Sequence, residues 1–88
     1  MQYVNLGNSG LKVSVLGFGN FITSSDSAGE LANSLVKHAW EAGINFFDTA
    51  ELYDNGMGEH QLGVAIKGLN VSRDQVVVAT KLFYGTSI

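Results

Sequence analysis

Residues 43–53 read Gly-Ile-Asn-Phe-Phe-Asp-Thr-Ala-Glu-Leu-Tyr, so a short apolar run ends in an acid and a tyrosine follows five residues later. A continuous apolar run such as residues 44–47 predicts a strand that is buried on both faces of a parallel sheet. Asp48 stands where this strand ends, and Tyr53 lies in the loop beyond it. Functional groups of parallel α/β proteins collect at the carboxyl ends of strands. We therefore expect Asp48 and Tyr53 to belong to one site.

The segments around this stretch alternate between strand patterns and helix patterns. Two short alternating runs flank a turn of glycine, asparagine and serine at residues 7–10, which predicts a β-hairpin. In chain order, the predicted elements are a hairpin at 3–6 and 11–15, a strand at 15–19, a helix at 27–42, a strand at 44–47, a helix at 59–69 and a strand at 75–80. This alternation implies right-handed βαβ crossovers and a parallel sheet, with no linker or domain boundary.

The ends of the first helix carry recognisable signals. Ser27 and Glu30 are spaced as a capping box, in which each side chain satisfies a backbone donor at the helix start. Gly43 follows the last turn, where a residue in the left-handed conformation is expected. The predicted apolar face of this helix consists of Leu31, Leu35, Ala39 and Ala42, with Ala32 and Val36 beside them.

The composition excludes several classes of protein. The chain has 88 residues, of which 45% are hydrophobic and 15% charged, as expected for one small globular domain. Its net charge is −3 and its five basic residues are scattered singly, which argues against a nucleic-acid partner. Without cysteine it can form no disulfide or thiolate metal site. We expect no membrane span and, because the amino terminus does not resemble a signal peptide, a cytoplasmic location.

Two familiar phosphate-binding motifs and a metal site are also not predicted. Gly17 and Gly19 could open a dinucleotide fingerprint, but residues 20–22 supply no third glycine at the start of a helix. No glycine-rich loop ends in lysine followed by serine or threonine, so a P-loop is excluded as well. His38 and His60 lie on predicted helices without a second ligand at suitable spacing, so we expect no metal site.

Lys81 ends the last predicted strand, as Asp48 ends the one before it. Because neighbouring parallel strands bring their carboxyl ends together, Asp48, Tyr53 and Lys81 can meet. A phenol is a poor acid at neutral pH because its pKa is about 10, and a nearby ammonium lowers that value. The three side chains could thus form a general acid that protonates a developing alkoxide. A structural ion pair between Asp48 and Lys81, with an unrelated surface tyrosine, is equally compatible with the spacing.

The same residues carry a family resemblance. Residues 43–53 resemble the signature of the aldo-keto reductases, and Thr80-Lys81 matches a later lysine of that family. Residues 3–14 and 81–85 are especially similar to the branch of voltage-gated potassium channel β-subunits. The resemblance covers the whole chain in sequence order.

This resemblance implies a (β/α)8 barrel that is closed at the bottom by an amino-terminal hairpin and binds NADPH without a Rossmann motif. It implies that Tyr53 is the acid, Lys81 the partner that lowers the pKa of the acid, and Asp48 the orienting carboxylate, which also lies at the cofactor. Gly19, Asn20 and Phe21 correspond to positions near the nicotinamide, where the family has glycine, threonine and tryptophan. Asn20 and Phe21 depart from that pattern but keep a hydrogen-bonding group and an aromatic surface.

A complete barrel of this type needs about 250 residues. Residues 1–88 are therefore expected to form a single partial domain, consisting of the hairpin and the first βαβαβ portion of an incomplete barrel. The fourth catalytic residue and most contacts to the cofactor would lie beyond Ile88. The open strand edges favour pairing with further strands, so we expect a piece of a longer protein, an oligomer or strand exchange with a partner.

Three functional hypotheses follow. The first is the amino-terminal portion of an NADPH-dependent reductase of aldehydes or ketones, inactive as this portion alone. The second is a non-catalytic regulatory or assembly subunit similar to potassium channel β-subunits, with a channel or another protein as its partner. The third is an unrelated α/β binding module, which would require the resemblance to be accidental.

Overall fold

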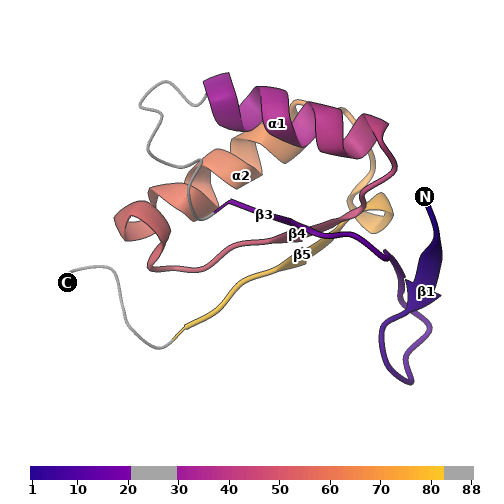
Figure 1. Ribbon diagram of the computed structural model, residues 1–88. Helices are drawn as coiled ribbons and strands as arrows, with labels where there is room; N and C mark the ends of the chain where they lie inside the picture. Colours follow the sequence, from indigo (N-terminus) through magenta and orange to yellow (C-terminus); the bar gives the residue numbers. More distant parts are fainter. Residues whose placement is uncertain (21–29, 83–88) are drawn as a thin grey trace.

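The computed structural model describes residues 1–20 and 30–82, and it contains two short sheets and two α-helices (Figure 1). The strands are β1 (Tyr3–Asn5), β2 (Lys12–Ser14), β3 (Phe18–Gly19), β4 (Phe46–Asp48) and β5 (Val77–Ala79). The α-helices are α1 (Glu30–Glu41) and α2 (Met57–Lys67), and short 3-10 turns cover Tyr53–Gly56 and Arg73–Gln75.

Strands β3, β4 and β5 form a parallel sheet in that order, and β1 pairs with β2 as a separate antiparallel hairpin. Both helices lie on one face of the parallel sheet (Figure 1). The mixed α/β class, the hairpin and the parallel order predicted from the sequence are thus confirmed. The three described strands leave the sheet open at both edges, so no barrel is closed within the described residues.

The core lies between the helices and the sheet. Phe47 of β4 is fully buried and points to the helices, with the ring of Phe18 6.0 Å away between centroids. The buried cluster around it consists of Val36, Ala39, Phe47, Leu62, Ala65 and Val76. Burying a side chain as large as Phe47 contributes about 2–3 kcal/mol to stability. This core fixes β4, the strand that carries Asp48, against both helices.

The face of α1 that is buried differs from the predicted one. Ala32, Val36 and Ala39 are buried, whereas Leu31 is 48% exposed and Ala42 is also exposed. The prediction that Leu31 and Ala42 lie in the core was therefore wrong for this part of the chain. The small side chains at positions 32 and 39 leave room for α1 to pack closely, so the helix turns this stripe inward.

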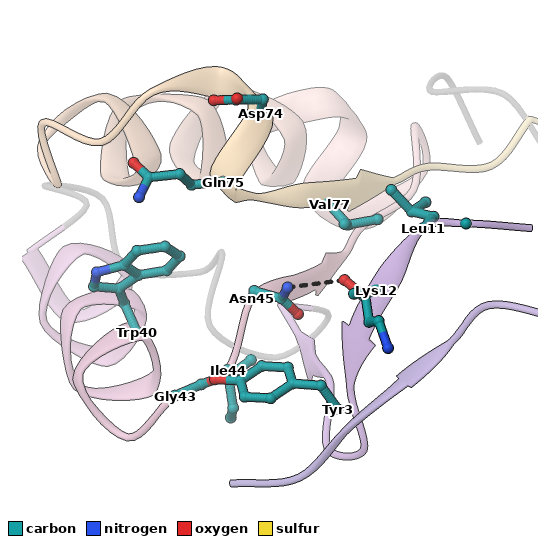
Figure 2. Close-up of a pocket in the computed structure, with 11 residues that line it drawn as sticks. Tyr3, Leu11, Lys12, Trp40, Gly43, Ile44, Asn45, Asp74, Gln75 and Val77 are labelled. Atoms are coloured by element: carbon teal, nitrogen blue, oxygen red, sulfur yellow. Dashed lines mark hydrogen bonds between the residues drawn. The ribbon is translucent and has the colours of Figure 1, made fainter.

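Asn45 ties the hairpin to the parallel sheet. Its side-chain oxygen accepts a hydrogen bond of 2.8 Å from the Ser14 N–H. Its amide nitrogen donates one of 3.0 Å to the Lys12 carbonyl, which Figure 2 shows as a dashed line. The Tyr3 hydroxyl adds a hydrogen bond to the Gly43 carbonyl. These contacts hold the hairpin at the amino ends of the strands, beside a pocket of about 540 Å³ that Trp40 also lines. The hairpin therefore lies at the end of the sheet opposite Asp48.

Several element boundaries differ from the predicted ones. The predicted strand at 15–19 is regular only at Phe18–Gly19, the second helix begins two residues early at Met57, and the strand predicted at 75–80 shortens to Val77–Ala79. The last change follows from a capping box between Ser72 and Gln75, which folds Arg73–Gln75 into a 3-10 turn. Ser27 of the predicted capping box lies outside the described residues, and Glu30 is the first residue of α1. Gly43 has φ +100°, as the predicted left-handed cap requires.

Candidate functional site

The candidate site lies where β4 and β5 end. Asp48 is the last residue of β4 and is paired with Ala79, the last residue of β5. Beyond the ladder, the Thr49 N–H donates to the Ala79 carbonyl at 2.8 Å, and the Glu51 N–H donates to the Lys81 carbonyl at 3.1 Å. These two bonds keep the chains side by side after the strands end. Lys81 is thereby brought next to Asp48, as predicted.

The Lys81 ammonium is held by three oxygen atoms. It donates to both carboxylate oxygens of Asp48 at 2.9 Å and to the Thr49 carbonyl at 2.7 Å. The side chains of Lys81 and Asp48 are 48% and 40% exposed, so the pair lies at the surface of the described chain. An exposed ion pair adds little to stability. The three bonds therefore matter because they fix the position of the Lys81 ammonium, and not because the ion pair stabilises the fold.

Tyr53 completes the group of predicted catalytic side chains. The Lys81 nitrogen lies 5.2 Å from the centroid of the Tyr53 ring, within the range of a cation–π contact. The pKa of Lys81 is raised above its ordinary value of 10.5, chiefly by the hydrogen bond to Asp48, with a smaller contribution from a hydrogen bond to Tyr53. Burial acts in the opposite direction but does not prevail. Lys81 is therefore a cation at neutral pH, in contact with both an acid and a phenol.

A sharp left-handed turn places Tyr53 over Lys81. Asp54 and Asn55 have φ of 50° and 54°, and Gly56 has φ of 100°. Asparagine, aspartate and glycine tolerate this region of the backbone better than other residues, which explains why this triplet follows Tyr53. The turn reverses the chain and starts α2 directly behind the tyrosine.

Gly58 is a position that the sequence interpretation missed. A Cβ atom added there would lie 2.7 Å from the Cβ of Tyr53 and 3.0 Å from the Tyr53 carbonyl oxygen. These two atoms belong to or adjoin the backbone of Tyr53, so they can move only if the backbone moves as well. Only glycine lets the first turn of α2 approach Tyr53 this closely. A glycine directly before the helix predicted at 59–69, five residues after a candidate catalytic tyrosine, was the available signal.

The residues predicted to lie at the cofactor differ in where the structure places them. Gly19 pairs with Asp48 across β3 and β4 and is exposed, so its backbone lies at the site. Asn20 is 1% exposed, and its side-chain amide donates to the Gly58 carbonyl at 2.8 Å. Asn20 therefore braces the start of α2, and a contact of this residue with a cofactor remains a prediction. Phe21 lies outside the described residues.

The described residues fit one end of NADPH and not the other. A phenol, an ammonium and a carboxylate at the carboxyl edge suit proton delivery at the reacting end of a nicotinamide cofactor. A dinucleotide also needs groups that bind its phosphates. The other basic residues, Lys12, Lys37, Lys67 and Arg73, lie on the hairpin, within or at the end of the helices, or before β5. None of these four lies in the described segments that directly follow β3, β4 and β5, although Lys67 and Arg73 line a groove together with Thr49 and Thr80.

The predicted non-ligand histidines also have clear positions. The ring of His38 lies 2.8 Å from the Ser34 carbonyl, one turn earlier on α1. His60 is exposed on α2. Within residues 1–20 and 30–82, no group of three histidine or acidic side chains could hold a metal ion. No helix in the same part of the chain is long and apolar enough to cross a membrane.

Comparison with known proteins decides the family. The sequence profile described as "Aldo/keto reductase family" matches residues 15–87. The chain is a member of the aldo/keto reductase family. This family is one of oxidoreductases, and the membership agrees with the resemblance predicted from the sequence.

Two plant relatives share one description within this aldo/keto reductase family. The chain is 45% identical over 86 residues to a protein of Arabidopsis thaliana described as a probable voltage-gated potassium channel subunit beta. It is 46% identical over 86 residues to a protein of Oryza sativa subsp. japonica with the same description. Each alignment covers 97% of this chain and 26% of the relative. The chain thus spans about a quarter of the length of the relatives that it matches.

Proposed function

We propose that the protein to which residues 1–88 belong is an NADPH-dependent reductase that converts aldehydes or ketones to alcohols. In this proposal the chain is the amino-terminal portion of a (β/α)8 barrel and contributes the proton-donating half of the active site. The observation that carries the proposal is the Lys81 ammonium, held by both oxygens of Asp48 and 5.2 Å from the Tyr53 ring. A structural ion pair alone would not require the tyrosine beside it.

Each of the three side chains has a role in the proposed reaction. Tyr53 gives its phenolic proton to the carbonyl oxygen while the carbonyl carbon is reduced, and the phenolate regains a proton from water. The Lys81 ammonium, 5.2 Å from the centre of the Tyr53 ring, supplies a positive charge beside the oxygen that gives up its proton. Asp48 and the Thr49 carbonyl fix the ammonium, so that little reorganisation is needed when charge develops.

The cofactor supplies the remaining chemistry. When bound, a reduced nicotinamide dinucleotide delivers a hydride to the carbonyl carbon, which the described side chains cannot provide. Gly19, beside Asp48 and without a side chain, is the described residue best placed to adjoin it. The groups that hold the phosphates belong to parts of the protein other than the described residues.

Replacing Tyr53 by Phe tests the proposed function. In the protein expressed from its complete coding sequence, Tyr53→Phe removes the acid but keeps the ring, so turnover should fall at least about a hundredfold, the usual size of a general-acid contribution. NADPH binding, measured by quenching of its fluorescence, should change little. Aldehyde and ketone reduction is followed by loss of NADPH absorbance. Turnover of Tyr53→Phe equal to that of the unmodified protein contradicts the assignment.

The similarity to the two plant proteins favours a second candidate function. The protein could serve as a regulatory or assembly subunit of a membrane channel and use the same fold for interaction. Co-purification of the tagged protein with a channel, together with negligible carbonyl reduction, would favour this second function. Turnover that depends on Tyr53, without any associated channel, would favour the reductase.

A further inference from the structure

One contact at the site was not anticipated from the sequence. The Thr80 hydroxyl donates a hydrogen bond of 2.6 Å to the Glu59 carboxylate, which connects the residue before Lys81 to α2. A bond this short between a hydroxyl and a carboxylate is of the strong, charge-assisted kind. Glu59 is the third residue of α2, where the positive end of the helix dipole favours a carboxylate. The Glu59 side chain is therefore well placed to hold Thr80.

The position of Thr80 explains why such a support is needed. Regular strand β5 ends at Ala79, so no ladder bond holds residues 80 and 81. Beyond Ala79, the described contacts from other elements to this backbone segment are the Glu51 N–H bond to the Lys81 carbonyl and the Glu59 bond to the Thr80 side chain. The Lys81 side chain is itself bonded to Asp48 and the Thr49 carbonyl, so the contact from Glu59 acts on the backbone from which this side chain reaches its partners.

The same turn of α2 also meets Tyr53. Gly58, the neighbour of Glu59, packs directly against the Cβ and the carbonyl of the tyrosine. Thus one helical turn contacts Tyr53 through residue 58 and reaches the lysine segment through residue 59. We propose that Glu59, acting through Thr80, is a positioning residue that sets the location of Lys81 relative to Tyr53 and Asp48. The inference rests on the proposed function, because the geometry matters only if the Tyr53 proton is transferred.

Four single variants separate positioning from general stability. Thr80→Val and Glu59→Ala each remove the hydrogen bond, whereas Thr80→Ser and Glu59→Gln keep a donor and an acceptor. In the protein expressed from its complete coding sequence, we expect the first pair to lower kcat about tenfold, because small displacements of catalytic groups have large effects. The second pair should recover most of that loss. Glu41→Ala, which removes an exposed carboxylate at the end of α1, is the matched control and should keep full activity.

Two further measurements test the inference, and the second of them does not depend on activity. The double variant Glu59→Ala/Thr80→Val should lose no more activity than the poorer single variant, since both remove one interaction. The pKa of Lys81, measured by NMR of lysine labelled at Cε, should fall in Thr80→Val, because the ammonium is less firmly held by Asp48. In Thr80→Ser it should stay at the value of the unmodified protein.

The outcomes distinguish the two proposals. If the unmodified protein reduces no carbonyl compound, the proposed function fails, and the Lys81 titration still decides whether Glu59 positions the lysine. If Thr80→Val keeps the kcat and the Lys81 pKa of the unmodified protein, the positioning role is overturned even though the reductase stands. Additive losses in the double variant would overturn it as well.

Discussion

At the scale of single residues, Gly58 decides where Tyr53 lies. A methyl group at this position would come within 3.0 Å of two atoms of the tyrosine, so Gly58→Ala should displace Tyr53 from the Lys81 ammonium. We expect a loss of turnover of about tenfold or more in the complete protein. Gly63, later on α2, has nothing within 4 Å of the place that an added methyl group would take, and it provides the control. Gly63→Ala should keep the activity; an equal loss in both variants would refute the specific role of Gly58.

The Lys81 ammonium predicts how stability depends on pH. Because its pKa is raised in the folded chain above the ordinary 10.5, the stabilising contribution is fully present below pH 10.5. It is lost as the pH rises through the higher folded value. Thermal unfolding of the unmodified protein and of Lys81→Met should therefore differ most below pH 10.5, and the difference should shrink above it. The effect is small because both side chains are partly exposed. A difference that grows above pH 10.5 would contradict this assignment.

At the scale of elements, Asn45 links the hairpin to β4. Asn45→Ala removes the bonds to the Ser14 N–H and the Lys12 carbonyl, so the free energy of unfolding should fall by about 1–2 kcal/mol. Denaturation with urea measures this change. Asn8→Ala, at the exposed tip of the hairpin, is the control and should change stability little. Since the hairpin lies at the amino ends of the strands, Asn45→Ala should leave the Lys81 pKa unchanged; a shifted value would show that the two ends are coupled.

The elements were largely predictable because their signals are local. The apolar run at 44–47, the glycine at 43 and the alternation of strand and helix patterns each act over a few residues, and they indicated the hairpin, the parallel order and the meeting of Asp48 with Lys81. The boundaries were less predictable because distant contacts set them. The start of α2 depends on three left-handed residues after Tyr53, and the buried face of α1 depends on what packs against it.

Other contacts between side chains that are distant in the sequence were not predicted. Glu59 and Thr80 are 21 residues apart, and nothing in either local pattern indicates their hydrogen bond. Asn20 matched a cofactor position in the family pattern, yet its amide braces Gly58. The sequence indicates which residues end neighbouring strands, and so the pairing of Asp48 with Lys81, but it does not indicate contacts that depend on how a helix packs, such as that of Glu59 with Thr80.

At the scale of the whole molecule, the described chain leaves apolar surface open. A groove of about 340 Å³ beside β5 is lined by residues of α2 and β5 that include Leu62, Ile66 and Val78, and Val78 is 36% exposed. Leu82, just beyond β5, is 79% exposed. An open strand edge beside apolar surface favours association with further strands. These features suit a sheet that continues beyond β5.

We therefore predict that residues 1–88 expressed alone do not form a stable monomer. The isolated chain should associate or unfold without a cooperative transition, because a domain of this size buries only roughly 60% of the surface of its unfolded chain and this one leaves both sheet edges open. Analytical ultracentrifugation and calorimetry test this expectation, with the protein from the complete coding sequence as the comparison. A monomer with one sharp thermal transition would show that the prediction is wrong.

The strand order β3-β4-β5 has a consequence for synthesis on the ribosome. Each strand pairs with the one made just before it, so the sheet can grow at one edge as the chain emerges, and no strand waits for a distant partner. The Asp48 carboxylate is made 33 residues before the Lys81 ammonium that it binds. In the nascent chain, the Asp48 carboxylate would therefore be in place at the end of β4 before Lys81 is made. The ion pair of Asp48 with Lys81 would then join the end of β5 to the end of β4.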